Sequence, residues 1–191
     1  MINITSAQNE IHAFQFQLTD SSIASTADYN DGKVILIDWA ASWCPVCKAN
    51  QVVMRNLYPE YSATVSFLSI STSETDTIEL MTEMKASKEW DFALDNVERY
   101  SNVVGASNGH TWILNSDLTL FKSWGKLALT KDTIANTLND ALEFNGISAT
   151  FEDLDQEISG FGVADNILFV GFVLVVAAAV IGTGLSRFRK Q

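Results

Sequence analysis

The pattern of hydrophobic and polar positions switches between strand-like and helix-like periods over the first 147 residues. Residues 12–18 (HAFQFQL) alternate apolar and polar side chains, which is typical of a strand with one buried face. Residues 34–39 (VILIDW) form a run rich in β-branched and apolar residues, typical of a central strand buried on both faces. Residues 21–32 are polar, end in the turn sequence NDG and are predicted to be a connection.

The remaining elements follow from the same criteria. Strands are predicted over residues 65–70, 92–94, 111–114 and 118–124, and helices over residues 45–61, 77–90, 97–104 and 131–144. Pro59 falls in the last turn of the first helix, and Gly146 lies just past the end of the last one. The alternation of strands and helices predicts an α/β domain over residues 1–147.

A 21-residue segment near the C-terminus, residues 166–186 (NILFVGFVLVVAAAVIGTGLS), has no charged side chain. As a helix with a rise of about 1.5 Å per residue it would span roughly 30 Å, which is the thickness of the hydrocarbon core of a bilayer. A buried core helix is the alternative, but such helices are usually shorter and amphipathic. We therefore expect one transmembrane helix, preceded by an acidic linker over residues 148–165 and followed by a basic tail over residues 187–191.

The charges divide at this segment. All 23 acidic residues lie in residues 1–165 together with nine of the twelve basic ones, a net charge of −14, whereas the last six residues (SRFRKQ) carry +3. Basic flanks favour the cytoplasmic side, so we expect a cytoplasmic tail and an extracytoplasmic domain. Residues 1–16 have neither a basic start nor a long apolar core. Either an export signal has been removed or left out, or the protein is tail-anchored with its domain in the cytoplasm. The acidic domain argues against nucleic acid as a partner.

The only two cysteines, Cys44 and Cys47, lie between the central strand and the first helix. Their bridge would close too short a loop to stabilise a chain of 191 residues, so the pair indicates chemistry. Cys44 occupies the cap position of the helix, where the partial positive charge lowers the pKa of a thiol, and Pro45 suits the first helical position. Cys47, one turn further on, can attack a mixed disulfide. A zinc half-site and two inert thiols are the alternatives; a closed zinc site would need further Cys or His ligands.

Residues 31–48 (DGKVILIDWAASWCPVCK) resemble the active-site segment of the thioredoxin superfamily, in particular the TlpA and ResA-like membrane-anchored thiol–disulfide oxidoreductases. The resemblance covers most of residues 10–144. It implies a thioredoxin-like fold, a central mixed sheet of four to five strands flanked by helices, with a helix–strand insertion before residue 111. It also implies that Cys44 attacks the substrate disulfide, that Cys47 resolves the resulting mixed disulfide, and that the apolar ring of Trp43 covers the two cysteines.

Asp38 lies six residues before Cys44, where thioredoxins have a buried acid beneath the disulfide. Burial raises the pKa of a carboxyl, and such a group can accept the Cys47 proton near neutral pH. The alternative is an aspartate at the strand end that bonds only to the backbone.

The segment SNGHTWIL (residues 107–114) departs from the family pattern, because His110 stands where the family has a cis-proline, followed here by Thr111. A cis bond before a non-proline residue costs about 2.5 to 4 kcal/mol, so we expect a trans or rebuilt loop and altered binding of substrate peptides. His110 is a candidate zinc or copper ligand with the two cysteines, a candidate modulator of the Cys44 pKa, or a solvated loop residue. His12 is predicted to be structural.

Two functions follow. The first is a membrane-tethered enzyme of cell redox homeostasis that exchanges its Cys44–Cys47 disulfide with cysteines of exported proteins. We expect it to act as a reductant and to need no cofactor beyond this redox-active disulfide. Its electrons would come from a membrane thiol–electron transporter. The second is a metallochaperone that carries copper or zinc on Cys44, Cys47 and His110.

Overall fold

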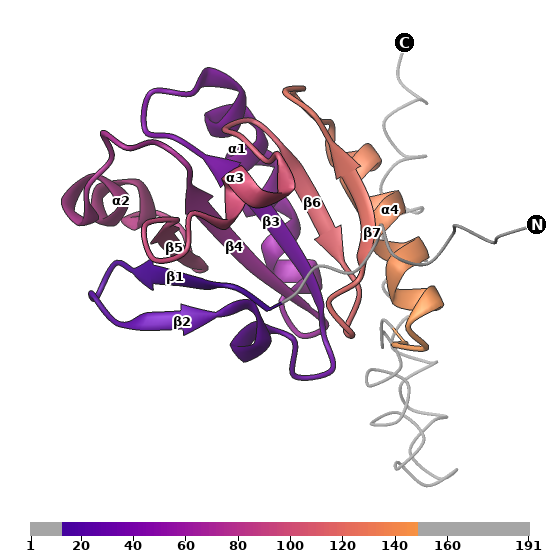
Figure 1. Ribbon diagram of the computed structural model, residues 1–191. Coiled ribbons are helices and arrows are strands. Elements are labelled where there is room, and N and C mark those ends of the chain that lie inside the picture. The colour runs from indigo at the N-terminus through magenta and orange to yellow at the C-terminus, as the bar shows by residue number, and fades with distance from the viewer. Residues whose placement is uncertain (1–12, 149–191) are drawn as a thin grey trace, which may run out of the picture. The chain divides into compact units, whose positions relative to one another are not determined.

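The computed structural model describes residues 13–148, which lie in one compact unit built on a single mixed sheet (Figure 1). The strand order is β2-β1-β5-β4-β3-β6-β7. The pairs β3–β4 and β4–β5 are parallel, and the other neighbours are antiparallel. The strands are β1 (Gln15–Leu18), β2 (Ile23–Ser25), β3 (Val34–Ala40), β4 (Val65–Ser71), β5 (Asp91–Leu94), β6 (Thr111–Leu114) and β7 (Leu120–Trp124). The α/β class is as predicted, but the predicted four to five strands are too few for this seven-stranded sheet.

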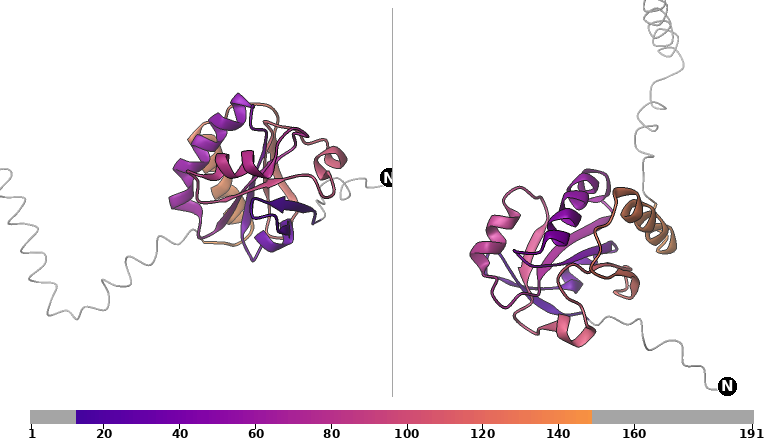
Figure 2. Two further views of the ribbon diagram at one scale, coloured as in Figure 1. Left: turned by 90° about the vertical axis from the view of Figure 1, so that its left-hand side faces the viewer. Right: turned by 90° about the horizontal axis from the view of Figure 1, so that it is seen from above.

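Helices lie on both faces of the sheet (Figure 2). They are η1 (a 3-10 helix, Thr26–Tyr29), α1 (Pro45–Tyr61), α2 (Ile78–Lys85), α3 (Tyr100–Val104) and α4 (Lys131–Phe144). Val34 and Leu36 of β3 pack in one apolar cluster with residues of α1, α2 and α4, and Ile35 and Ile37 pack in a second cluster with residues of η1 and α3. Alternate residues of β3 therefore enter opposite cores, so the strand is buried on both faces along its whole length.

Three predicted elements differ from the structure. Residues 21–32, predicted to be a connection, contain β2 and η1, and Ser25 and Asp28 form a capping box at the start of η1. The helix predicted over residues 77–90 ends at Lys85, and that predicted over residues 97–104 begins only at Tyr100. This later start follows from Arg99, which has a left-handed backbone (φ 49°), and from Asp95, whose carboxylate accepts the N–H of Tyr100.

The other predictions are confirmed closely. α1 and α4 have the predicted bounds, including Pro59 inside α1, and Gly146 adopts the positive φ that favours glycine after a helix. The strand predicted over residues 12–18 is β1, which begins at Gln15. α2 and β5 form the expected helix–strand insertion between β4 and β6.

The predicted membrane segment lies outside the described residues. The transmembrane helix (166–186), the basic tail (187–191) and all but the first residue of the linker (148–165) are in this part of the chain. Within residues 13–148, no helix is both long enough and apolar enough to cross a bilayer.

Candidate active site

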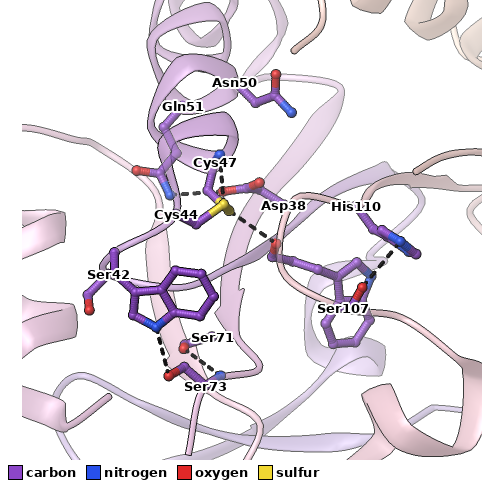
Figure 3. Close-up of a disulfide and its surroundings, with 12 residues drawn as sticks. Asp38, Ser42, Cys44, Cys47, Asn50, Gln51, Ser71, Ser73, Ser107 and His110 are labelled. Carbon is purple, nitrogen blue, oxygen red and sulfur yellow. Dashed lines mark hydrogen bonds between the residues drawn. A yellow bond between two sulfur atoms is a disulfide. The ribbon is translucent and has the colours of Figure 1, made fainter. Parts of the chain in front are cut away.

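Cys44 and Cys47 form a disulfide between the end of β3 and the first turn of α1 (Figure 3). Cys44 is the N-cap of α1, and its Sγ accepts the Cys47 N–H at 3.1 Å. Pro45 takes the first helical position, where its missing N–H leaves no bond unmade. Both predicted positions are thus observed, and the Cys47 N–H at the start of α1 points to the Cys44 sulfur, where it would stabilise a thiolate.

The disulfide is covered by protein, whereas the residue before it is open to solvent. Cys44 is 3% exposed and Cys47 is fully buried, but Trp43 is 59% exposed. The Trp43 indole Nε1 donates a hydrogen bond to Ser73 Oγ at 3.3 Å. This places an aromatic surface next to Cys44 along the chain, tethered to the loop that follows β4.

Asp76 fixes the segment before Cys44. Its buried carboxylate accepts the Ser42 N–H at 2.8 Å, the Ser42 hydroxyl at 2.7 Å and the Ser71 hydroxyl at 2.7 Å. These bonds join the loop after β3 to the end of β4. Sequence analysis missed this residue, because nothing in the local pattern links positions 42 and 76.

A polar pocket of about 200 Å³ lies beside this network, at the carboxyl ends of the parallel strands β4 and β5. Arg99 and Glu74 form an ion pair at it. Its lining comprises Ser71, Thr72, Ser73, Glu74, Asp76, Leu94, Asp95, Asn96 and Arg99. Ser73 is shared by this pocket and the Trp43 indole, so the pocket adjoins the surface around the disulfide.

The predicted acid, Asp38, is fully buried in β3. Burial raises its pKa to about 7 from 3.8, and hydrogen bonding from Gln51 and Ser69 opposes part of that rise. Gln51 Nε2 donates to Asp38 Oδ2 at 2.8 Å, while Oδ1 has no hydrogen-bond partner among the described residues. Since Gln51 follows Cys47 by one helical turn, the carboxyl lies beneath the start of α1, as the sequence predicts.

Asn50 is a second buried residue that sequence analysis missed. Its side-chain amide donates to Thr111 Oγ1 at 3.2 Å and to the Leu127 carbonyl at 3.1 Å, and its oxygen accepts the Leu129 N–H at 2.8 Å. Asn50 therefore joins α1 to β6 and to the loop before α4. Thr111 itself is fully buried in this network and does not reach the surface.

The loop at His110 is rebuilt with trans peptides, as expected. No cis peptide bond occurs within residues 13–148. The Gly109 N–H donates to the Trp39 carbonyl at 2.7 Å, and the His110 N–H donates to the Ser107 carbonyl at 3.0 Å. Both donors are therefore used inside the domain and are not free to pair with a substrate backbone.

The His110 ring turns to Ser107, with Nε2 at 3.3 Å from Ser107 Oγ (Figure 3). Partial burial, with a smaller effect of the Lys126 cation, lowers the His110 pKa below its usual value. In the described part of the chain, no three His, Cys, Asp or Glu side chains gather in a way that could hold a metal ion. The structure thus joins Cys44 to Cys47 without adding His110 to them. His12 lies outside the described residues.

The Trp39 carbonyl connects the loop to the cysteines. It accepts the Gly109 N–H, and the Cys47 Sγ lies 3.7 Å from the same oxygen. In the disulfide this sulfur has no proton, so the second contact becomes a hydrogen bond only after reduction.

Comparisons with known proteins agree with this geometry. The chain matches the model of the Redoxin family over residues 6–135. No curated protein sequence matches it.

Solved structures share the fold at low sequence identity. A putative protein disulfide isomerase from Bacteroides thetaiotaomicron has 16% identity and a TM-score of 0.59, covering 73% of this chain and 92% of that one. A putative thiol:disulfide interchange protein DsbE from Chlorobium tepidum has 15% identity and a TM-score of 0.59, covering 70% and 96%. BsSco, of the Sco family of cytochrome c oxidase assembly proteins, has 17% identity and a TM-score of 0.57, covering 73% and 95%.

Proposed function

The chain belongs to the Redoxin family and is a thiol–disulfide oxidoreductase, and from that premise we propose that it reduces disulfides in protein substrates while held at a membrane. One arrangement carries the proposal: a Cys44–Cys47 disulfide at the N-terminus of α1, above the buried Asp38 whose pKa is about 7. It combines an activated nucleophile, a resolving thiol and a base that titrates near neutral pH.

The reaction proceeds in two exchanges. The Cys44 thiolate attacks a substrate disulfide, forming a mixed disulfide and releasing one substrate thiolate. Asp38 then takes the proton of the Cys47 thiol, and the Cys47 sulfur attacks Cys44 Sγ and releases the second substrate thiolate. Two electrons pass from the dithiol to the substrate, and the released thiolates take up the protons.

The expected direction of electron transfer follows from how few groups stabilise the Cys44 thiolate in the reduced protein. Cys44 Sγ accepts one N–H bond, and Pro45 and Val46 carry no polar side chain towards it. Extra cationic donors around the sulfur stabilise the reduced thiolate, and a protein with such a site is an oxidant. Because the Cys44 sulfur has a single N–H donor within the described domain, we expect this protein to be a reductant. The expected potential is about −220 to −280 mV, the range of thioredoxin-like reductants.

Substrate docking uses the Trp43 side of the disulfide. On the opposite side, the Gly109 and His110 N–H groups are already bonded within the domain. Trp43 is exposed beside Cys44, and polar side chains line the adjoining pocket. Cysteine-containing segments of other proteins are the substrates, in line with the likeness to a putative protein disulfide isomerase and a putative thiol:disulfide interchange protein.

Residues 166–186 are the anchor, with the domain on the extracytoplasmic side and the basic tail in the cytoplasm. In that orientation the domain receives electrons from a membrane thiol–electron transporter. Reporter fusions at the two ends test this topology. An N-terminal reporter that is active only in the cytoplasm contradicts it.

A glutathione redox titration of the chain, followed by alkylation of free thiols and a gel-shift assay, tests the function. The proposal requires one reversible two-electron couple in the stated range, which disappears in Cys44→Ser. A potential near about −120 mV would instead identify an oxidant. If no reversible couple appears, the pair does not perform disulfide exchange.

The likeness to BsSco favours a second candidate, a metallochaperone that binds copper or zinc through Cys44, Cys47 and His110. The disulfide would then be a storage state, and reduction would have to bring the imidazole to the two thiolates. Stoichiometric metal in the reduced protein that is lost in His110→Ala would support this candidate. Metal-free reduced protein that reduces insulin would exclude it.

A further inference from the structure

Gln51 is the side chain in direct contact with the buried carboxyl. Its Nε2 lies 2.8 Å from Asp38 Oδ2, and Gln51 is 2% exposed. Figure 3 shows the bond running from α1 to β3 beside the disulfide. The other carboxyl oxygen, Oδ1, is buried without a hydrogen-bond partner among residues 13–148. The two oxygens of one carboxyl are therefore in different environments.

This difference matters for proton transfer. A primary amide donates hydrogen bonds and does not titrate, so Gln51 occupies Oδ2 at every pH. A buried oxygen that lacks a donor is unfavourable when the carboxyl is charged, and this cost is relieved when that oxygen takes a proton. The proton therefore goes to Oδ1.

We propose that Gln51 is the positioning residue of the exchange reaction: it holds Asp38 by Oδ2 and leaves Oδ1 as the atom that accepts the proton of the Cys47 thiol. This inference rests on the proposed function, because it assigns one atom in the second exchange. In that step the Cys47 S–H bond breaks and an O–H bond forms at Oδ1. The Cys47 electron pair forms the bond to Cys44 Sγ, the bond from Cys44 Sγ to the substrate sulfur breaks, and its electron pair leaves with the substrate thiolate.

The other groups facing Asp38 do not replace this role. Ser69 of β4 and Thr111 of β6 pair with Asp38 across the sheet, and hydrogen bonding from Ser69 lowers the carboxyl pKa less than that from Gln51 does. Among residues 13–148, the one cation that acts on the Asp38 carboxyl is Lys88, which lowers its pKa. Lys88 Nζ lies 5.0 Å from the centre of the ring of Phe92, a residue of β5, and β4 separates β5 from β3 in the sheet.

A carboxyl titration tests the contact without using the redox activity. The full chain is oxidised, so that neither cysteine titrates, and labelled with ¹³C at the aspartate carboxyl carbons; the Asp38 signal is identified by its loss in Asp38→Asn. We expect a midpoint near 7 in the natural protein. In Gln51→Met, which keeps the side-chain length and removes the donor, the midpoint should rise by about one to two pH units. Gln17→Met on β1 is the matched control and should leave it unchanged.

A kinetic measurement then tests the role. The rate at which Cys47 resolves a mixed disulfide is followed against pH in the natural protein, Gln51→Met, Asp38→Asn and the double variant. In Gln51→Met, the acid limb of the pH–rate profile should move to higher pH by the same number of pH units as the Asp38 carboxyl midpoint. In the Asp38→Asn background, Gln51→Met should have no further effect on the profile, because Gln51 acts only through that carboxyl.

An unchanged Asp38 midpoint in Gln51→Met overturns the inference, and so does an equal effect of this substitution with and without Asp38. Gln51→Leu repeats the titration if the methionine variant does not fold. Failure of the proposed function would appear elsewhere, as the absence of a reversible couple in the glutathione titration, and would leave the carboxyl midpoint measurable.

Discussion

Replacing the buried carboxyl by a neutral amide should stabilise the domain in a strongly pH-dependent way. Asp38 has a pKa of about 7 in the folded protein, against 3.8 for an ordinary aspartate. Between these pH values the folded state holds a proton that the unfolded state has lost, so stability falls as the pH rises through this window. A difference of about three pH units corresponds to about 4 kcal/mol, reached in full above pH 7. Asp38→Asn removes this dependence. We expect a gain of up to about 4 kcal/mol in the free energy of unfolding at pH 8 and little change at pH 4.

Urea denaturation of the oxidised protein between pH 4 and pH 9 measures this difference. The side-chain volume hardly changes, so a packing effect would be the same at every pH. Asp140→Asn removes an exposed carboxyl on α4 and is the control. Its free energy of unfolding should differ from that of the natural protein by the same small amount at every pH. The reasoning is refuted if the stability difference between Asp38→Asn and the natural protein is constant across this range, because the carboxyl would then not titrate inside the fold.

Three further predictions concern the surroundings of the disulfide. Cys47→Ser should trap a mixed disulfide through Cys44 at about one equivalent of substrate on a non-reducing gel, and rapid release would show that Cys47 does not resolve it. His110→Ala should change the exchange rate by less than about twofold between pH 7 and pH 9, because a lowered pKa leaves the ring neutral there; a tenfold loss would give the ring a direct role. Asp76→Ala should lower the free energy of unfolding at pH 7 by about 2 to 4 kcal/mol, since three donors lose their acceptor. Asp76→Asn should recover part of this loss in the same urea titration, and an equal loss in both variants would mean that the acceptor oxygens do not matter.

The elements that sequence patterns predict well are those whose signals are local and long. β3 is apolar at every position except Asp38, and α4 combines a helical apolar stripe with a Thr130 cap and Gly146 past its end. β2 was missed because three residues at the edge of the sheet carry too little pattern to be seen. The helix predicted over residues 77–90 was too long because Trp90 continues the apolar spacing. In the structure, the Trp90 indole instead bonds to Ser69 Oγ at 3.0 Å, next to β5.

The same distinction holds at the active site. The cysteine pair is recognisable from its place between a strand and a helix, and Asp38 from the resemblance of this segment to thioredoxin-like active sites. Asp76 and Asn50 are not, because the bonds from Ser42 to Asp76 and from Leu129 to Asn50 join residues that are 34 and 79 positions apart. Gln51 is close to Asp38 in the chain, but its alignment with the carboxyl depends on how α1 packs over β3, which no local pattern specifies.

The Trp39 carbonyl oxygen is in contact with both Cys47 and Gly109, and therefore links the redox state of the cysteines to the loop over residues 107–110. This oxygen holds the Gly109 N–H at 2.7 Å in the oxidised state, and reduction adds the Cys47 thiol as a second donor. Reduction and the position of the loop over residues 107–110 are then thermodynamically coupled through one atom. Such coupling is reciprocal, so a partner protein that binds the loop more tightly in one redox state must shift the reduction potential by the same free energy. Any protein that bound this loop would in that way help to determine when the enzyme releases its electrons.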